Sequence, residues 1–214
     1  QVQVMAALGH EAFHVVGHDR GARVGHRMAL DHAESVLSFT SLDVVASEAA
    51  FEAMDCDMAF SWFHWNLMRQ PAPLPETMIA NSVALYLDFL LDTWCGTEGA
   101  ITDQARGEYL RCFSDPDCIR ATCLDYRAIT LDLEHDAADR GRKIRAPMLV
   151  LWASEMARRP GWQTGRSLDI LESWRERAES VDGRALACGH FLPEELPEET
   201  AAEIGAFIDR IKTG

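Results

Sequence analysis

The sequence contains no long hydrophobic run, and this absence excludes a transmembrane helix. No stretch approaches the roughly 18 to 20 uninterrupted apolar residues that a membrane-spanning helix requires. Residues 1–8 also lack the basic-then-apolar arrangement of a secretory signal. We therefore expect a cytoplasmic protein that does not bind membranes.

Cysteines are few, and their spacing does not fit a metal site. The 214 residues include six cysteines, without a C-x-x-C pair or the spacing of a small disulfide-bonded domain. Buried, reduced thiols are the expected state. His10, His14 and His18 recur every four residues, but we expect His14 in a strand and His10 at a helix end, so they share no face. We predict no metal and no organic cofactor.

Basic residues are also scarce. The chain has 20 Lys and Arg against 34 Asp and Glu, a formal net charge of -14. This balance argues against nucleic acid or an anionic membrane as a partner. If the ligand is itself an anion, the protein must concentrate positive charge locally, which makes any arginine beside a candidate nucleophile informative.

Short apolar runs alternate with helical segments along the chain. The runs predict strands over residues 13–17, 36–42, 146–152 and, more weakly, 184–188. Apolar residues at helical spacing predict a helix directly after the first of these strands. This alternation is typical of parallel β-α-β units. We therefore predict an α/β fold with a mostly parallel sheet and helices on both faces.

The composition changes between Ser47 and about Gly141, where Trp, Met, Phe and helical periodicity dominate. We predict an all-helical cap over residues 47–141, inserted between two parts of the sheet domain, residues 1–46 and 142–214. Within the cap, residues 80–94 predict a helix that is amphipathic to buried.

Gly17-His18-Asp19-Arg20-Gly21 has the G-x-nucleophile-x-G form of a nucleophile elbow, with Asp in place of the common serine. Small residues are expected two positions before and two after the nucleophile, because the tight turn strains its backbone. The pentapeptide falls between an expected strand and an expected helix, which is the context that the motif requires. The alternative is an Asp that only caps the helix.

Two further residues follow in the order nucleophile, acid, histidine. Asp43 ends the second expected strand, at the edge where such sheets place their chemistry, and His190 follows the last strand in a loop that begins with Gly189. Taken singly, Asp43 could be a turn residue and His190 a loop histidine. An Asp nucleophile displaces a leaving group from an sp3 carbon and leaves an ester, which water then cleaves with His190 as base and Asp43 as its partner.

Five segments together resemble the fluoroacetate (haloacetate) dehalogenases of the α/β-hydrolase superfamily. They are GHDRGARVGHRMALDH (17–32), SLDVV (41–45), FHWNLMRQPAPLPE (63–76), DYRA (125–128) and GHFLPEELPEET (189–200). The resemblance implies the α/β-hydrolase fold, Asp19 as nucleophile, His190 as base and Asp43 as its partner. It also implies a small anionic haloacid as substrate and suggests a homodimer.

The resemblance further implies that Arg20 and Arg23 bind the substrate carboxylate. Two guanidiniums, one directly after the nucleophile and one a helical turn later, can both reach the same pocket. The alternative is two surface arginines on a helix. Relatives that act on neutral haloalkanes or epoxides usually carry Trp after the nucleophile, whereas this chain has Arg.

A leaving halide ion needs hydrogen-bond donors, and the resemblance implies which residues provide them. His64, Trp65 and Tyr126 occupy the motifs that bind halide in the family, and N–H and O–H donors suit a strongly hydrated leaving fluoride. Trp94 resembles a pocket-wall residue of the family. Packing in a hydrophobic core is the alternative for the Trp and Tyr side chains.

The chain departs from the family in two places. The upstream strands, and the His-Gly loop that provides one oxyanion-hole N–H, have no counterpart here, so we expect a chain truncated at its N-terminus. Residues 153–156 (ASEM) stand where relatives tend to be rich in glycine. The alternatives are a haloalkane dehalogenase, an epoxide hydrolase, or an inactive fragment that acts as a binding module. An epoxide hydrolase needs two lid tyrosines, and of three tyrosines only Tyr126 lies in a matching motif.

Overall fold

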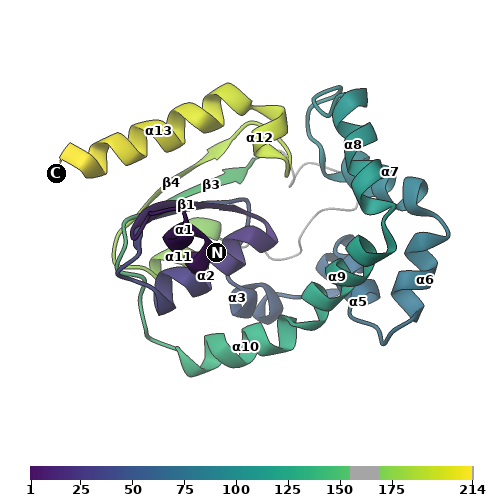
Figure 1. The fold of residues 1–214 in the computed structure, drawn as a ribbon, viewed down its shortest axis with the longest axis horizontal. Coiled ribbons are helices and arrows are strands. Elements are labelled where there is room, and N and C mark those ends of the chain that lie inside the picture. The colour runs from purple at the N-terminus through teal and green to yellow at the C-terminus, as the bar shows by residue number, and fades with distance from the viewer. Residues whose placement is uncertain (155–168, 214) are drawn as a thin grey trace.

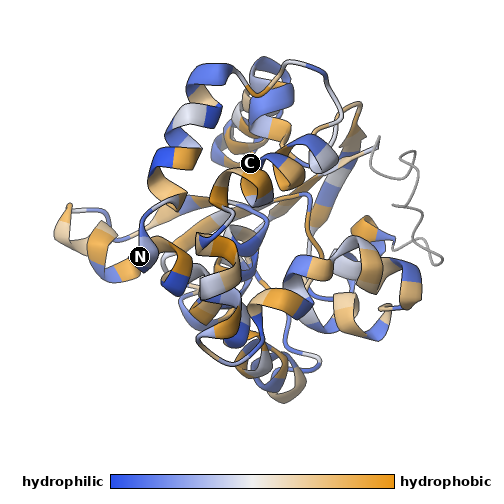
Figure 2. Ribbon diagram, turned by 90° about the vertical axis from the view of Figure 1, so that its right-hand side faces the viewer, coloured by the Kyte–Doolittle hydropathy of each residue, from blue (hydrophilic) through white to orange (hydrophobic). Residues whose placement is uncertain are grey.

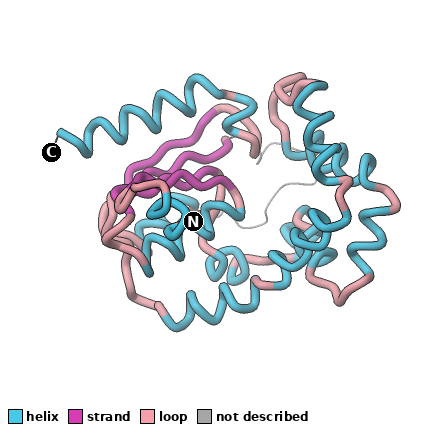
Figure 3. The backbone as a smooth tube through the Cα atoms, viewed as in Figure 1, coloured by secondary structure: helices cyan, strands magenta, loops and turns pink. Residues whose placement is uncertain are grey.

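A four-stranded parallel sheet forms the centre of the protein. The computed structural model describes residues 1–154 and 169–213, and its sheet has the order β1-β2-β3-β4 (Figures 1 and 3). The strands are β1 (Phe13–His18), β2 (Val36–Leu42), β3 (Met148–Ala153) and β4 (Val181–Leu186), and every neighbouring pair is parallel. The predicted α/β fold with a parallel sheet is confirmed.

β4 begins three residues earlier than the predicted run 184–188 and ends two residues earlier. Pairing with β3 sets Val181 opposite Met148 and Leu186 opposite Ala153. The first four positions of β4 alternate between partly buried and exposed. The exposed positions of β4 carry the charged residues Asp182 and Arg184, so a search for continuous apolar runs did not find the start of this strand.

Helices cover both faces of the sheet, as predicted (Figure 1). On one face, α2 (Arg20–Asp31) and α11 (Ile170–Arg175) enclose a core that includes Phe39, Val150 and Trp174. On the other face, α13 (Pro197–Thr213) packs Phe207 against Leu151. Figure 2 shows hydrophilic and hydrophobic residues alternating along these helices, which is expected when one side of a helix faces the core.

All the described residues between β2 and β3 are helical or loop, and we call residues 47–138 the helical insertion (Figure 3). Its helices are α3 (Ser47–Glu52), α4 (Cys56–Ser61), α5 (Phe63–Met68), α6 (Leu74–Ala80), α7 (Val83–Trp94), α8 (Asp103–Phe113), α9 (Pro116–Arg127) and α10 (Ile129–Ala138). Trp65, Ile79, Ile119 and Ile129 belong to a separate hydrophobic cluster within it. The remaining short helices are α1 (Val2–Ala7) and α12 (Leu192–Glu195).

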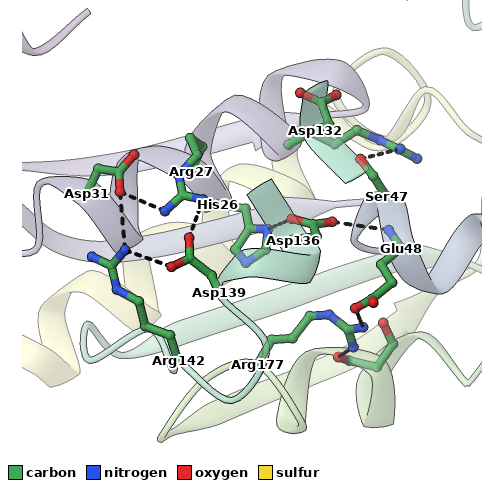
Figure 4. A network of polar contacts seen from close by, with 12 residues as sticks. His26, Arg27, Asp31, Ser47, Glu48, Asp132, Asp136, Asp139, Arg142 and Arg177 are labelled. Carbon is green, nitrogen blue, oxygen red and sulfur yellow. Dashed lines mark hydrogen bonds and ion pairs between the residues drawn. The ribbon is translucent and has the colours of Figure 1, made fainter. Parts of the chain in front are cut away.

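A network of ion pairs fixes the last part of the insertion against the sheet layer (Figure 4). Arg27 of α2 contacts Asp139 at 2.5 Å, directly after α10. Asp136 of α10 accepts a hydrogen bond from the backbone N–H of Glu48 at 3.1 Å, and the Glu48 carboxylate lies 3.4 Å from Arg177. Single surface pairs contribute little stability, so the main effect of this network is to orient α3 and α10 relative to α2.

The cysteine expectation needs a correction. Cys95, Cys123 and Cys188 are buried as expected, but Cys56 and Cys112 are exposed and Cys118 is only partly buried. Cys56 and Cys112 lie in helices α4 and α8 of the insertion, where helices have solvent-facing positions that sequence spacing did not identify. Of the glycine-poor segment 153–156, the last two residues lie outside the described residues. No helix in the described part of the chain is long and apolar enough to cross a membrane.

Candidate active site

The nucleophile elbow joins β1 to α2. Asp19 lies between them with φ 50° and ψ -123°, a strained conformation for a residue with a side chain. A Cβ atom at Gly17 would lie 2.6 Å from the Cα of Ala22, so glycine is required there. A Cβ at Gly21 would meet nothing within 4 Å, so the expected need for a small residue after the nucleophile is wrong in this structure. Asp19 also accepts a hydrogen bond from the Arg20 N–H, so it caps α2 as well.

Asp19, Asp43 and His190 come together from three distant parts of the chain. The Nε2 atom of His190 lies 3.1 Å from Oδ2 of Asp19, and its Nδ1 lies 2.7 Å from Oδ2 of Asp43. Asp43 follows β2 with φ 51°, and its other oxygen accepts the Ala153 N–H at 2.8 Å. The side chains of His190 and Asp43 are 8% and 6% exposed, whereas that of Asp19 is 34% exposed. The candidate nucleophile is therefore the accessible member of the three.

The charges of these groups depend on one another. Burial lowers the pKa of His190, but hydrogen bonds to Asp19 and Asp43 outweigh burial and raise that pKa to about 10. Burial raises the pKa of Asp19, but the hydrogen bond with His190 and the charges of His190 and Arg23 hold it well below its usual value. At neutral pH these shifts favour a protonated His190 beside an ionised Asp19.

The backbone of His190 is held on both sides. Its N–H donates to the carbonyl of Trp94 at 2.8 Å. Its carbonyl lies 2.8 Å from Nε2 of His18, which must carry the proton because a carbonyl only accepts. Burial and the charge of His190 lower the pKa of His18, so this ring is neutral. His18 lies within the elbow motif, and the motif itself predicts no role for the residue at this position.

The two predicted carboxylate-binding arginines have different surroundings. Arg23 is 7% exposed, its Nη1 donates to Ser47 Oγ at 2.9 Å, and its guanidinium lies 4.5 Å from the centre of the Trp65 ring. Burial lowers its pKa to about 10, although the charge of Asp19 opposes this shift. Within residues 1–154 and 169–213, Arg23 forms no ion pair and its buried Nε has no acceptor. A cation in this state is suited to binding an anion.

Arg20 is already paired. Its Nε lies 2.6 Å from Oδ2 of Asp125 and its Nη2 lies 3.1 Å from Oδ1 of the same carboxylate, while its Nη1 lies 3.2 Å from Asp132. The guanidinium fork is therefore occupied by Asp125 of α9. Asp125 belongs to the DYRA segment, but nothing in the sequence predicts that it binds Arg20.

The four aromatic residues predicted for halide binding and the pocket wall lie together. The His64 ring centre is 4.5 Å from that of Trp94, 5.6 Å from Tyr126 and 6.4 Å from Trp65. Burial lowers the pKa of His64 to about 3, although the charge of Asp19 opposes the shift. Its buried Nδ1 has no partner among the described residues. Burial and the charge of Asp19 raise the pKa of Tyr126, so its hydroxyl keeps its proton. The cluster thus offers neutral N–H and O–H donors near Asp19.

The His and acidic side chains of the site pair with one another. Across residues 1–154 and 169–213, no three His, Cys, Asp or Glu side chains are placed to hold a metal ion together. His190 contacts both Asp19 and Asp43, a geometry compatible with the predicted roles of nucleophile, base and acid.

A family model described as alpha/beta hydrolase fold matches residues 1–156. The chain belongs to the alpha/beta hydrolase family. This hydrolase is 36% identical, over its whole length, to a fluoroacetate dehalogenase from Burkholderia sp., of which it spans 69%. A solved structure provisionally named an alpha/beta hydrolase, from Nostoc sp., is 47% identical with a TM-score of 0.91, covering 97% of this chain and 70% of that one.

A further solved relative is provisionally named an epoxide hydrolase. This protein, a mutant from Pseudomonas aeruginosa with bound MFA, is 38% identical with a TM-score of 0.91, covering 100% of this chain and 71% of that one. These three relatives share the fold, and two different activities, dehalogenase and epoxide hydrolase, appear in their names. The choice between these activities for this hydrolase depends on its own residues.

Proposed function

We propose that this hydrolase removes the halogen from a small haloacetate, forming glycolate and halide through an ester on Asp19. One observation carries the proposal: the ionised Asp19 contacts His190 and is near Arg23, a buried cation that has no carboxylate partner among residues 1–154 and 169–213. The similarity to a fluoroacetate dehalogenase supports the same substrate class. A halogenated acid that is itself anionic would supply the charge that Arg23 lacks.

In the first step a carboxylate oxygen of Asp19 attacks the carbon that bears the halogen. The new C–O bond forms as the C–halogen bond breaks, and the halide leaves with the bonding electrons. Arg23 holds the substrate carboxylate, while donors from His64, Trp65 and Tyr126 stabilise the departing halide. Asp19 needs no base for this step, because it is already ionised.

Esterification of Asp19 then changes the state of His190. The ester has no negative charge, so His190 loses one of the two carboxylates that raise its pKa and can release its proton to solvent. The neutral imidazole takes a proton from water as the water oxygen attacks the ester carbonyl carbon. Asp43 balances the imidazolium that forms. Cleavage of the acyl C–O bond releases glycolate, whose hydroxyl oxygen takes the remaining proton of the attacking water, and Asp19 is again a carboxylate.

The test is halide release from fluoroacetate, chloroacetate and bromoacetate by a purified protein that contains residues 1–214. We expect release from at least one of them, loss of release in Asp19→Asn, and a transient mass increase on Asp19 equal to one carboxymethyl group. Turnover of neutral haloalkanes that is indifferent to Arg20→Ala and Arg23→Met would contradict the proposal. Absence of any covalent intermediate in a folded sample would favour a binding module.

The epoxide hydrolase names among the relatives make that activity the competing candidate. Activation of an epoxide oxygen by two tyrosines is less compatible with this site. Tyr86 stacks on Phe113 and Tyr109 contacts Glu194, whereas only Tyr126 is part of the cluster around His64. Hydrolysis of a neutral epoxide at a higher kcat/KM than any haloacetate would favour the competing candidate.

A further inference from the structure

A buried carboxylate that takes no part in the proposed reaction lies beside the loop of the candidate base. Glu195 is the last residue of α12 and is 7% exposed. Its Oε2 accepts the backbone N–H groups of Gly96, Thr97 and Gly189 at 2.8, 2.8 and 2.9 Å, and its Oε1 accepts that of Phe191 at 3.1 Å. Burial of a carboxylate is costly unless its oxygens are hydrogen-bonded, and four donors meet this need.

These four donors belong to two loops that are far apart in the sequence. Gly189 and Phe191 are the residues on either side of His190. Gly96 and Thr97 follow α7 of the helical insertion. One side chain therefore fixes both the loop that carries the base and the end of a helix from another layer of the protein.

The two loops also touch directly. The N–H of His190 donates to the Trp94 carbonyl, and a Cβ atom at Gly96 would lie only 2.4 Å from the backbone nitrogen of Gly189. Such a close approach of two backbones requires glycine. The Trp94 ring centre lies 5.4 Å from that of His190 and 4.5 Å from that of His64. The position of the base is thus linked to the position of the aromatic cluster.

We propose that Glu195 is a positioning residue for His190: its carboxylate holds the loop of the base against the end of α7, so that the imidazole and Trp94 keep one arrangement. The inference rests on the proposed dehalogenation, because its consequence concerns the second step. Displacement of a catalytic group by about 1 Å can slow a step about 10²-fold. Attack by Asp19 requires no proton transfer, so disruption of this junction slows ester hydrolysis more than ester formation.

The test uses Glu195→Gln, because an amide has one acceptor oxygen where the carboxylate has two. Whichever way the amide is turned, its NH2 group faces at least the Phe191 N–H, and two donors cannot form a hydrogen bond with each other. With bromoacetate we expect the first burst of halide within about threefold of the unsubstituted protein. We expect hydrolysis of the ester to fall by about 10- to 100-fold, so that the ester accumulates in mass spectra. Glu198→Gln is the matched control, because Glu198 is an exposed residue of the next helix, and both rates should stay unchanged.

Wild-type hydrolysis in Glu195→Gln, or an equal loss in both steps together with a lower melting temperature, would overturn the inference. A second measurement does not depend on turnover: the proton NMR signal of the His190 Nδ1–H in substrate-free protein should shift or broaden in Glu195→Gln and not in Glu198→Gln. An unchanged signal would also overturn it. If the unsubstituted protein forms no ester, the proposed function fails, and the NMR signal still decides whether Glu195 positions His190.

Discussion

Replacement of Arg23 by Met should abolish the proposed preference of this hydrolase for an anionic substrate, whereas replacement of Arg20 by Met should have a small effect. The two arginines are three residues apart on α2, but Arg20 is bound by the carboxylates of Asp125 and Asp132, and Arg23 has the neutral Ser47 as its hydrogen-bond partner. A substrate carboxylate therefore gains most from Arg23.

The magnitude follows from the burial and the pairing. Two charge-assisted hydrogen bonds from the buried Arg23 to a carboxylate contribute about 1.5–3 kcal/mol each, or about 3–6 kcal/mol together. Since about 1.4 kcal/mol corresponds to a factor of ten, kcat/KM for chloroacetate should fall by about 10²- to 10⁴-fold in Arg23→Met. For Arg20 the charge is already balanced, so the loss should be about tenfold or less.

The assay compares chloroacetate with chloroacetamide, a neutral substrate of similar shape. In Arg23→Met, kcat/KM for chloroacetamide should change by less than about threefold, because this substrate presents no carboxylate to Arg23. The reasoning is refuted if both substrates lose activity equally. It is also refuted if Arg20→Met reduces chloroacetate turnover more than Arg23→Met does.

Two further predictions concern stability. Gly17→Ala should lower the free energy of unfolding by about 1–3 kcal/mol, because its Cβ would press on Ala22. Gly21→Ala has open space in a helix, so it should leave the free energy of unfolding unchanged or raise it by up to about 1 kcal/mol. Urea denaturation measures both variants, and the reverse order would contradict the structure. Since the folded pKa of His190 is raised to about 10, its stabilising contribution is fully present below about pH 6.5 and is lost as the pH rises through about 10. Asp19→Asn removes the first of the interactions that raise this pKa, so in the variant the loss should be smaller and should be complete at a lower pH. Melting temperatures measured from pH 6 to 10 test this, and parallel curves for the two proteins would count against it.

Local patterns in the sequence determined the fold and the position of the reacting groups. A continuous apolar run predicts a buried strand, as for residues 146–152, because both faces of a central strand are covered. Asp19 lies in a motif that depends on the turn from one strand to the next helix, which involves only neighbouring residues. Asp43 and His190 could be grouped with it because the carboxyl ends of parallel strands meet at one edge of the sheet. The start of β4 was missed, since an edge strand carries polar residues on its solvent face.

The sequence alone thus determined the α/β class, the elbow and the likeness of five segments to one enzyme family, since these depend on local spacing. Only the tertiary structure decided which partner each buried charge has. Arg20 binds Asp125 across 105 residues of sequence. Glu195 accepts hydrogen bonds from two backbone N–H groups that are 99 and 98 residues away. Such pairs depend on how the helices pack. Helix packing brings together residues that are far apart in the sequence, and no sequence pattern predicts which of them will meet. This packing leaves Arg23 without a carboxylate among the residues that the structure describes, and the proposed substrate would supply one.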